Sequence, residues 1–142
     1  MEVMMVVTII GLLSAIATVG YRHCRLRAIA SSFGNDLRVY KDAVNQYVGE
    51  TGNYNIGAPS GQLPIALNAY VKNTAFERKT VIGGHWRIDS SIDSIELAVG
   101  VEHFNAPIET LDLIDRLFDN GNIDTGSLRL VSANKYFWII KE

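Results

Sequence analysis

Apolar residues divide the chain into a front segment that is hydrophobic on all sides and a longer part in which they alternate with polar ones. The front segment, residues 3–21, carries no charged side chain and follows a single acidic residue, Glu2. A run of about nineteen residues is long enough for an α-helix to cross the hydrocarbon core of a bilayer. Residues 1–21 are therefore predicted to form a helix that needs lipid or other helices around it.

The helical pattern continues beyond this run without a stop signal, but it becomes one-sided. Large apolar residues now recur every three or four positions, the spacing of a single helix face, and polar residues take the opposite face. Gly34 is the only helix-breaking residue type inside the pattern, and an isolated glycine costs about 1 kcal/mol without ending a helix. One helix is thus predicted from about residue 3 to about residue 48, on the order of 70 Å long, with residues 22–50 as its amphipathic part. The stripe predicted to pack against a head consists of Leu26, Ile29, Phe33, Leu37, Tyr40, Val44, Tyr47 and Val48.

Residues 51–142 leave room for one small globular head. Gly52 is placed to end the long helix, and the Asn-, Gly- and Pro-rich residues 53–61 predict a loop. Alternation and turn residues predict the remaining elements: short helices over 65–71 and 108–118, and strands over 86–89, 93–102, 128–131 and 136–140. The predicted fold is α+β, a long N-terminal helix packed on a small antiparallel sheet.

The segment EVMMVVTIIGLLSAIA resembles the N-terminus of type IV pilins and type II secretion pseudopilins. After leader removal, those proteins begin with Phe-Thr-Leu-Ile-Glu or a close variant, so Glu2 matches the family glutamate and Gly11 the glycine midway along the helix. The leader and the first mature residues have no counterpart here, so we expect the gene to begin further upstream or the chain to be truncated. Val19 stands where many members carry a helix-bending proline, which leaves Gly11 and Gly20 as the candidate sites of helix flexibility.

The resemblance implies a pilin-like structural subunit of a bacterial filament, without enzymatic activity or a cofactor. Such a subunit is stored in the inner membrane as a single-pass protein with its head outside the cytoplasm, and it polymerises through its N-terminal helix. The implied partners are other copies in a helical filament, the membrane, and the pilus or secretion assembly machinery. In the family the glutamate is thought to meet the N-terminal amine of a neighbour, which makes Glu2 the candidate assembly residue. The alternative for Glu2 is a solvated position among the lipid headgroups.

Two other functional classes stay open. The first is a membrane anchor that holds an unrelated binding or sensory domain. Arg22, Arg25 and Arg27 follow the apolar run, and this charge bias would place the head in the cytoplasm unless the missing leader supplies more positive charge in front. The second is a secreted domain released after Ala15-Ile16-Ala17 by signal peptide cleavage, although the run lacks the basic residues that normally precede such a site.

Composition and motifs exclude several activities. The formal net charge is −2 and no basic patch is present, so nothing indicates nucleic-acid binding. The single cysteine, Cys24, cannot form an intramolecular disulfide, and the three histidines lack the spacing of a zinc site. The oxygen-rich loop 119–126 offers Asp119, Asn122 and Asp124 as calcium ligands. It lacks the EF-hand pattern, however, and its residues are common in ordinary turns, so no metal is predicted.

Overall fold

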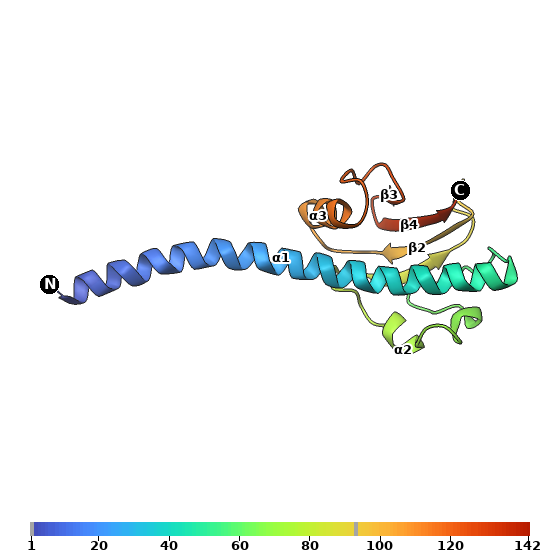
Figure 1. Cartoon of the computed structure of the whole chain (residues 1–142), viewed down its shortest axis with the longest axis horizontal. Helices are drawn as coiled ribbons and strands as arrows, with labels where there is room; N and C mark the ends of the chain where they lie inside the picture. The colour runs from blue at the N-terminus through green and yellow to red at the C-terminus, as the bar shows by residue number, and fades with distance from the viewer. Residues whose placement is uncertain (1, 93) are drawn as a thin grey trace.

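One long helix organises the whole molecule (Figure 1). The computed structural model describes residues 2–92 and 94–142, and within them α1 runs without interruption over Glu2–Thr51. Gly52 follows with a φ of +67°, and its N–H donates a hydrogen bond of 2.7 Å to the carbonyl of Val48. Glycine adopts this left-handed conformation at little cost, which explains the helix end at this position. The prediction of a single helix through both sequence regions is confirmed.

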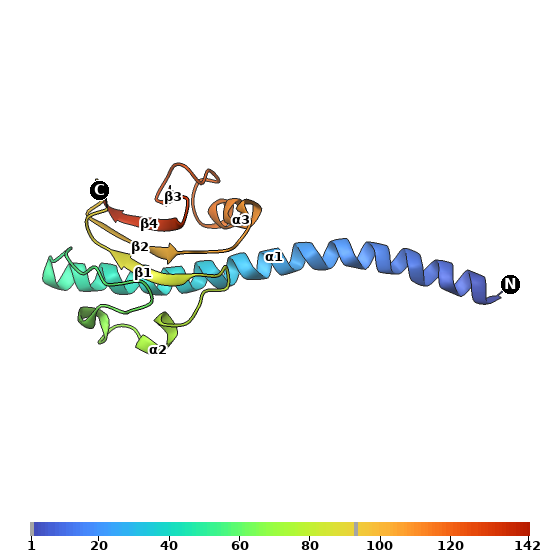
Figure 2. The same ribbon diagram turned by 180° about the vertical axis from the view of Figure 1, so that it is seen from behind.

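The head places a four-stranded sheet against the C-terminal half of α1 (Figures 1 and 2). All neighbouring strands are antiparallel, and the spatial order is β1-β2-β4-β3. The strands are β1 (His85–Asp89), β2 (Leu97–Glu102), β3 (Leu128–Ser132) and β4 (Lys135–Lys141). Three further helical elements complete the described chain: η1 (Ile65–Leu67), α2 (Asn73–Phe76) and α3 (Ile108–Phe118). The predicted α+β layout is therefore correct.

The predicted stripe of α1 forms the centre of the core, although its ends are only partly covered. Phe33, fully buried, stacks on Trp86 with ring centroids 5.1 Å apart and lies 6.3 Å from the ring of Tyr136. Burial of a large apolar side chain contributes about 1.5–3 kcal/mol, so this face supplies much of the head's stability. The buried stripe residues are Phe33, Leu37, Tyr40 and Val44, while Leu26, Ile29, Tyr47 and Val48 are half-buried.

Gly34 is buried beside this stripe for a packing reason that the sequence did not reveal. A Cβ atom at this position would come within 2.0 Å of the Phe118 ring at the end of α3. The bare backbone thus lets α3 approach α1 closely, and the guanidinium of Arg38 covers the same ring at 5.1 Å. The residue that weakens the helix by propensity is the one that admits α3.

The strand predicted over 93–102 is too long at its N-terminal end. Ile92 and Ile95 exchange backbone hydrogen bonds of 3.1 and 2.8 Å across a tight turn, so β2 begins only at Leu97. This turn breaks the alternation, and Ile95 packs beside Phe137 instead of joining Leu97 in the core against α1. Residue 93 itself lies outside the described residues.

The short helices differ from the prediction more than the strands do. The segment predicted as helix 65–71 forms only the three-residue η1 and then a turn, because Ile65 is 88% exposed and only Leu67 of η1 is buried. A separate short helix, α2, was not predicted, since four residues with one buried side chain, Phe76, give no periodic signal. Helix α3 has the predicted bounds, but Ile108 and Leu117 at its ends are exposed.

Candidate functional site

The front half of α1 is the largest feature that the head does not explain. It extends away from the head (Figure 1), and its most apolar window has a mean hydropathy of 2.3 with no residue buried. The large apolar side chains up to Val19 are exposed by fractions from 52% at Ile9 to 78% at Met4. A continuous apolar surface of this size marks an interaction site. This helix is long and apolar enough to span a membrane.

The two threonine side chains within this segment are compatible with an apolar environment. The hydroxyl of Thr8 donates to the carbonyl of Met4 at 2.7 Å, and that of Thr18 donates to Ser14 at the same distance. Both hydroxyls are therefore satisfied within the helix, as a membrane requires because no water is available there. Glu2 is the only charged residue in the segment that precedes Arg22.

The three residues singled out in this segment lie on one uninterrupted helix. Glu2 occupies the first turn and is exposed, where a carboxylate interacts favourably with the helix dipole. A Cβ atom at Gly11 or Gly20 would meet nothing within 4 Å. Helix α1 curves gently here without a sharp kink (Figure 1). The two glycines thus leave the surface open for another helix or for lipid.

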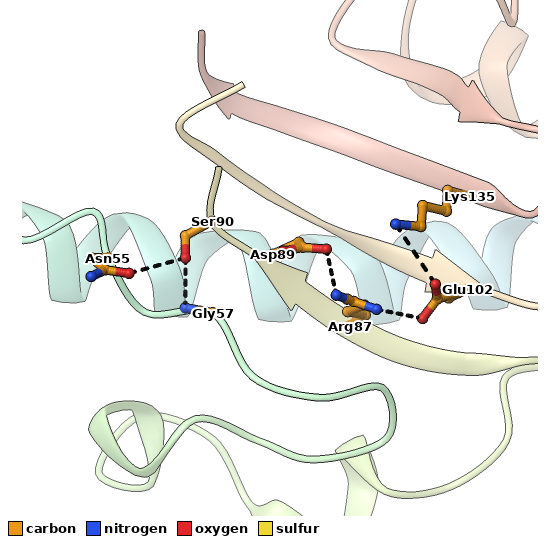
Figure 3. A network of polar contacts seen from close by, with 7 residues as sticks. All are labelled: Asn55, Gly57, Arg87, Asp89, Ser90, Glu102 and Lys135. Atoms are coloured by element: carbon orange, nitrogen blue, oxygen red, sulfur yellow. Dashed lines mark hydrogen bonds and ion pairs between the residues drawn. The ribbon is translucent and has the colours of Figure 1, made fainter. Parts of the chain in front are cut away.

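A charged network on the sheet face turned away from α1 was not predicted from the sequence. Arg87 on β1 contacts Asp89 and Glu102 at 2.8 Å each, and Lys135 lies 3.8 Å from Glu102 (Figure 3). Burial alone would raise the pKa of Glu102, but the hydrogen bond from Arg87 and the nearby positive charges outweigh burial and hold this pKa below its usual value. The network joins β1, β2 and β4, which indicates a structural role.

A second polar group in Figure 3 attaches the loop after α1 to the edge of the sheet. The hydroxyl of Ser90 donates to the Asn55 side chain at 3.2 Å and accepts from the N–H of Gly57 at 3.2 Å. Backbone bonds from Ala58 to the Ile88 carbonyl and from Gly61 to the Trp86 carbonyl extend this attachment. The loop therefore covers the free edge of β1, which would otherwise offer unpaired backbone groups.

Two of the three side chains that the sequence offers as calcium ligands, Asp119 and Asn122, use their oxygen atoms to hold the loop 119–126. Asp119 Oδ2 accepts a hydrogen bond of 2.9 Å from the N–H of Leu128, and Asn122 Oδ1 accepts one of 3.1 Å from the N–H of Asp124. Such bonds are typical of turns closed by Asn and Asp side chains. In the part of the chain that the structure describes, no group of three or more His, Cys, Asp or Glu is arranged to hold a metal ion.

Asp115 on α3 is a buried carboxyl group that sequence reasoning missed. Its side chain is fully buried, and neither carboxyl oxygen has a hydrogen-bond partner within the described residues. Burial raises the pKa of Asp115, and the backbone N–H groups of Gly121 and Asn122 offset part of this shift without completing a well-formed hydrogen bond. One feature of the sequence could have indicated that Asp115 is buried. It follows Leu111 by four residues and therefore lies on the apolar face of the helix.

The described surface thus offers an exposed apolar helix with an acidic first turn, and a head whose polar clusters serve the fold. No family model, curated protein or solved structure matches this chain.

Proposed function

We propose that this protein is a structural subunit of a type IV pilus-like or type II secretion pseudopilus filament. It is stored in the inner membrane through the front half of α1, with its head outside the cytoplasm. It polymerises with other copies of itself, with the help of a pilus or secretion assembly machinery. No catalytic step and no cofactor belong to this role.

The observation that supports the proposal is that the two halves of one helix have different surroundings. Its C-terminal half provides the core face of the head, while its front half is apolar and exposed on all sides. The same apolar surface can be covered by lipid in the monomer and by identical helices in an assembly. Head-to-tail contacts between copies do not close, so they propagate into a helical filament.

Glu2 is the residue that we assign to subunit assembly, following the resemblance of the N-terminal segment. A carboxylate among packed apolar helices is costly unless a cation from a neighbouring subunit pairs with it, so it would fix the axial register. Loss of one member of a buried ion pair costs about 3–5 kcal/mol, and this loss would recur at every subunit addition.

The test is filament yield in the native cell, expressed from the native gene with its upstream sequence. Glu2→Ala should leave membrane insertion intact and abolish or sharply reduce filaments, while Glu2→Asp should give an intermediate yield. Ser14→Ala on the same helix is the control, and it should assemble normally. Normal filaments from Glu2→Ala, at a wild-type amount of inserted monomer, would refute the assembly role.

A single-pass anchor for a binding or sensory domain is the second candidate. Arg22, Arg25 and Arg27 favour it, since positive charge after a span normally stays in the cytoplasm. Cys24 discriminates between the two, because it is the only cysteine, is exposed, and lies directly after the apolar run. A membrane-impermeant maleimide applied to spheroplasts should label Cys24 if the head is outside the cytoplasm. Labelling only after lysis would contradict the filament proposal.

A further inference from the structure

A groove of about 430 Å³ lies where the head meets the exposed half of α1. One wall is α1, and the other is formed by the turn before β1 and the start of α3, at the end of the head nearer the N-terminus (Figure 1). Its volume falls in the range of small-molecule sites. The residues that matter for its chemistry are Arg22, Arg25, Leu26, Ile29, Val81 and Glu109.

The depth of this groove relative to a membrane follows from the helix. The uncharged run of about nineteen residues ends at Tyr21 and spans on the order of 28 Å, close to the thickness of a hydrocarbon core. Arg22 is the next residue, and Arg25 follows almost one helical turn later. Both guanidinium groups therefore reach the level of lipid phosphates when the front half of α1 spans a bilayer.

Charges of opposite sign line the groove without pairing with each other. Arg22 and Arg25 extend from α1, and Glu109 extends from the first turn of α3; all three are exposed. Among the ion pairs of residues 2–92 and 94–142, none involves these three side chains. A ligand that carries both a phosphate and a cation fits between them, because it can satisfy both walls at once.

We propose that this groove binds the zwitterionic headgroup of an aminophospholipid such as phosphatidylethanolamine. Arg22 and Arg25 bind the phosphate, and Glu109 binds the ammonium. Val81, 49% exposed, contacts the ethanolamine carbons together with Leu26 and Ile29. This inference rests on the membrane-stored state of the proposed function, and it adds a specific lipid partner to that state.

The test measures lipids retained by the full chain in native mass spectrometry from mild detergent. Phosphatidylethanolamine and phosphatidylglycerol are added at equal concentration. The wild-type chain should retain one phosphatidylethanolamine in preference to phosphatidylglycerol, by about three-fold or more. Because each arginine near a lipid phosphate strengthens binding roughly five-fold, Arg22→Gln with Arg25→Gln should weaken retention of both lipids by more than ten-fold. Glu109→Gln should remove the preference alone.

Two further variants separate a groove from general attraction at the membrane surface. Val81→Trp, on the head and far from the span in sequence, should reduce lipid retention because its larger, neutral side chain fills the groove without changing the charge. Arg129→Gln with Glu142→Gln removes an exposed ion pair of 2.7 Å that does not line the groove, and it should change nothing. Equal retention of the two lipids by the wild type, or wild-type retention by Val81→Trp, would overturn the inference. Fractionation of the same variants tests membrane storage separately, so failure of the proposed function is distinguishable from failure of the lipid site.

Discussion

Truncation of Phe33 is the sharpest test of how the head is held on α1. Its ring has no exposed surface and is stacked against Trp86, with Tyr136 on the same cluster. Phe-to-Ala changes at buried sites cost about 3–5 kcal/mol, and stacked aromatic pairs account for about 0.5–1.5 kcal/mol of such a loss. Because a domain of this size is stable by about 5–15 kcal/mol, Phe33→Ala should remove about a fifth or more of the free energy of unfolding.

The assay is urea denaturation of the full chain in mild detergent, with unfolding monitored by tryptophan fluorescence. Phe33→Leu keeps most of the volume and should cost only about 1–1.5 kcal/mol. Phe33→Asp adds an unpaired buried charge and should leave the head unfolded. Val39→Ala, on the exposed face of the same helix with 57% of Val39 accessible, is the control and should stay within about 0.5 kcal/mol of wild type.

The reasoning is refuted if Phe33→Ala and Val39→Ala lose the same small amount of stability. That result would mean that the stripe of α1 does not form the core face. Wild-type stability of Phe33→Asp would lead to the same conclusion, since a carboxylate is costly at a fully buried position in an aromatic cluster.

Three other predictions follow from the fold. Gly34→Ala should destabilise the head by about 1–3 kcal/mol in urea denaturation, because displacement of the Phe118 ring outweighs the gain in helix propensity; Gly49→Ala, where a Cβ meets nothing, should stabilise by up to about 1 kcal/mol. The raised pKa of Asp115 means that the contribution of this group to stability is lost as pH rises above about 4, so the stability of Asp115→Asn relative to wild type should increase from about pH 3 to about pH 7 in the same assay. A fragment that begins at Arg25 should be soluble and folded, whereas one that lacks residues through 48 should aggregate in a sedimentation assay, since it exposes the core.

The long helix and its stripe could be predicted from the sequence because their signal is local and repeated. Residues three and four apart must share a face of any helix, so Phe33, Leu37 and Tyr40 needed no knowledge of the head. Ile95 shows where such reasoning stops. It continues the alternation of β2 in the sequence, but a tight turn moves it to the other face, and that turn depends on packing.

The candidate sites also differ in whether the sequence alone could predict them. The apolar front of α1 follows from composition alone, whereas the groove combines residues 22–29 of α1 with two segments that follow them by more than fifty residues. No pattern in the sequence relates Arg25 to Glu109. The Arg87–Glu102 pair was equally hidden, because its partners lie on different strands whose register only the sheet determines.

The contact between Phe33 and Tyr136 also determines how the protein can be made. These residues are about 100 positions apart in the chain, and ribosomes add roughly 5–20 residues per second. The apolar face of the helix is therefore synthesised roughly 5–20 seconds before the strand that finally covers it. During that interval the nascent chain presents an aromatic surface without its native partner. Biogenesis of this protein therefore favours protection of this surface by a chaperone until the last strand has been made.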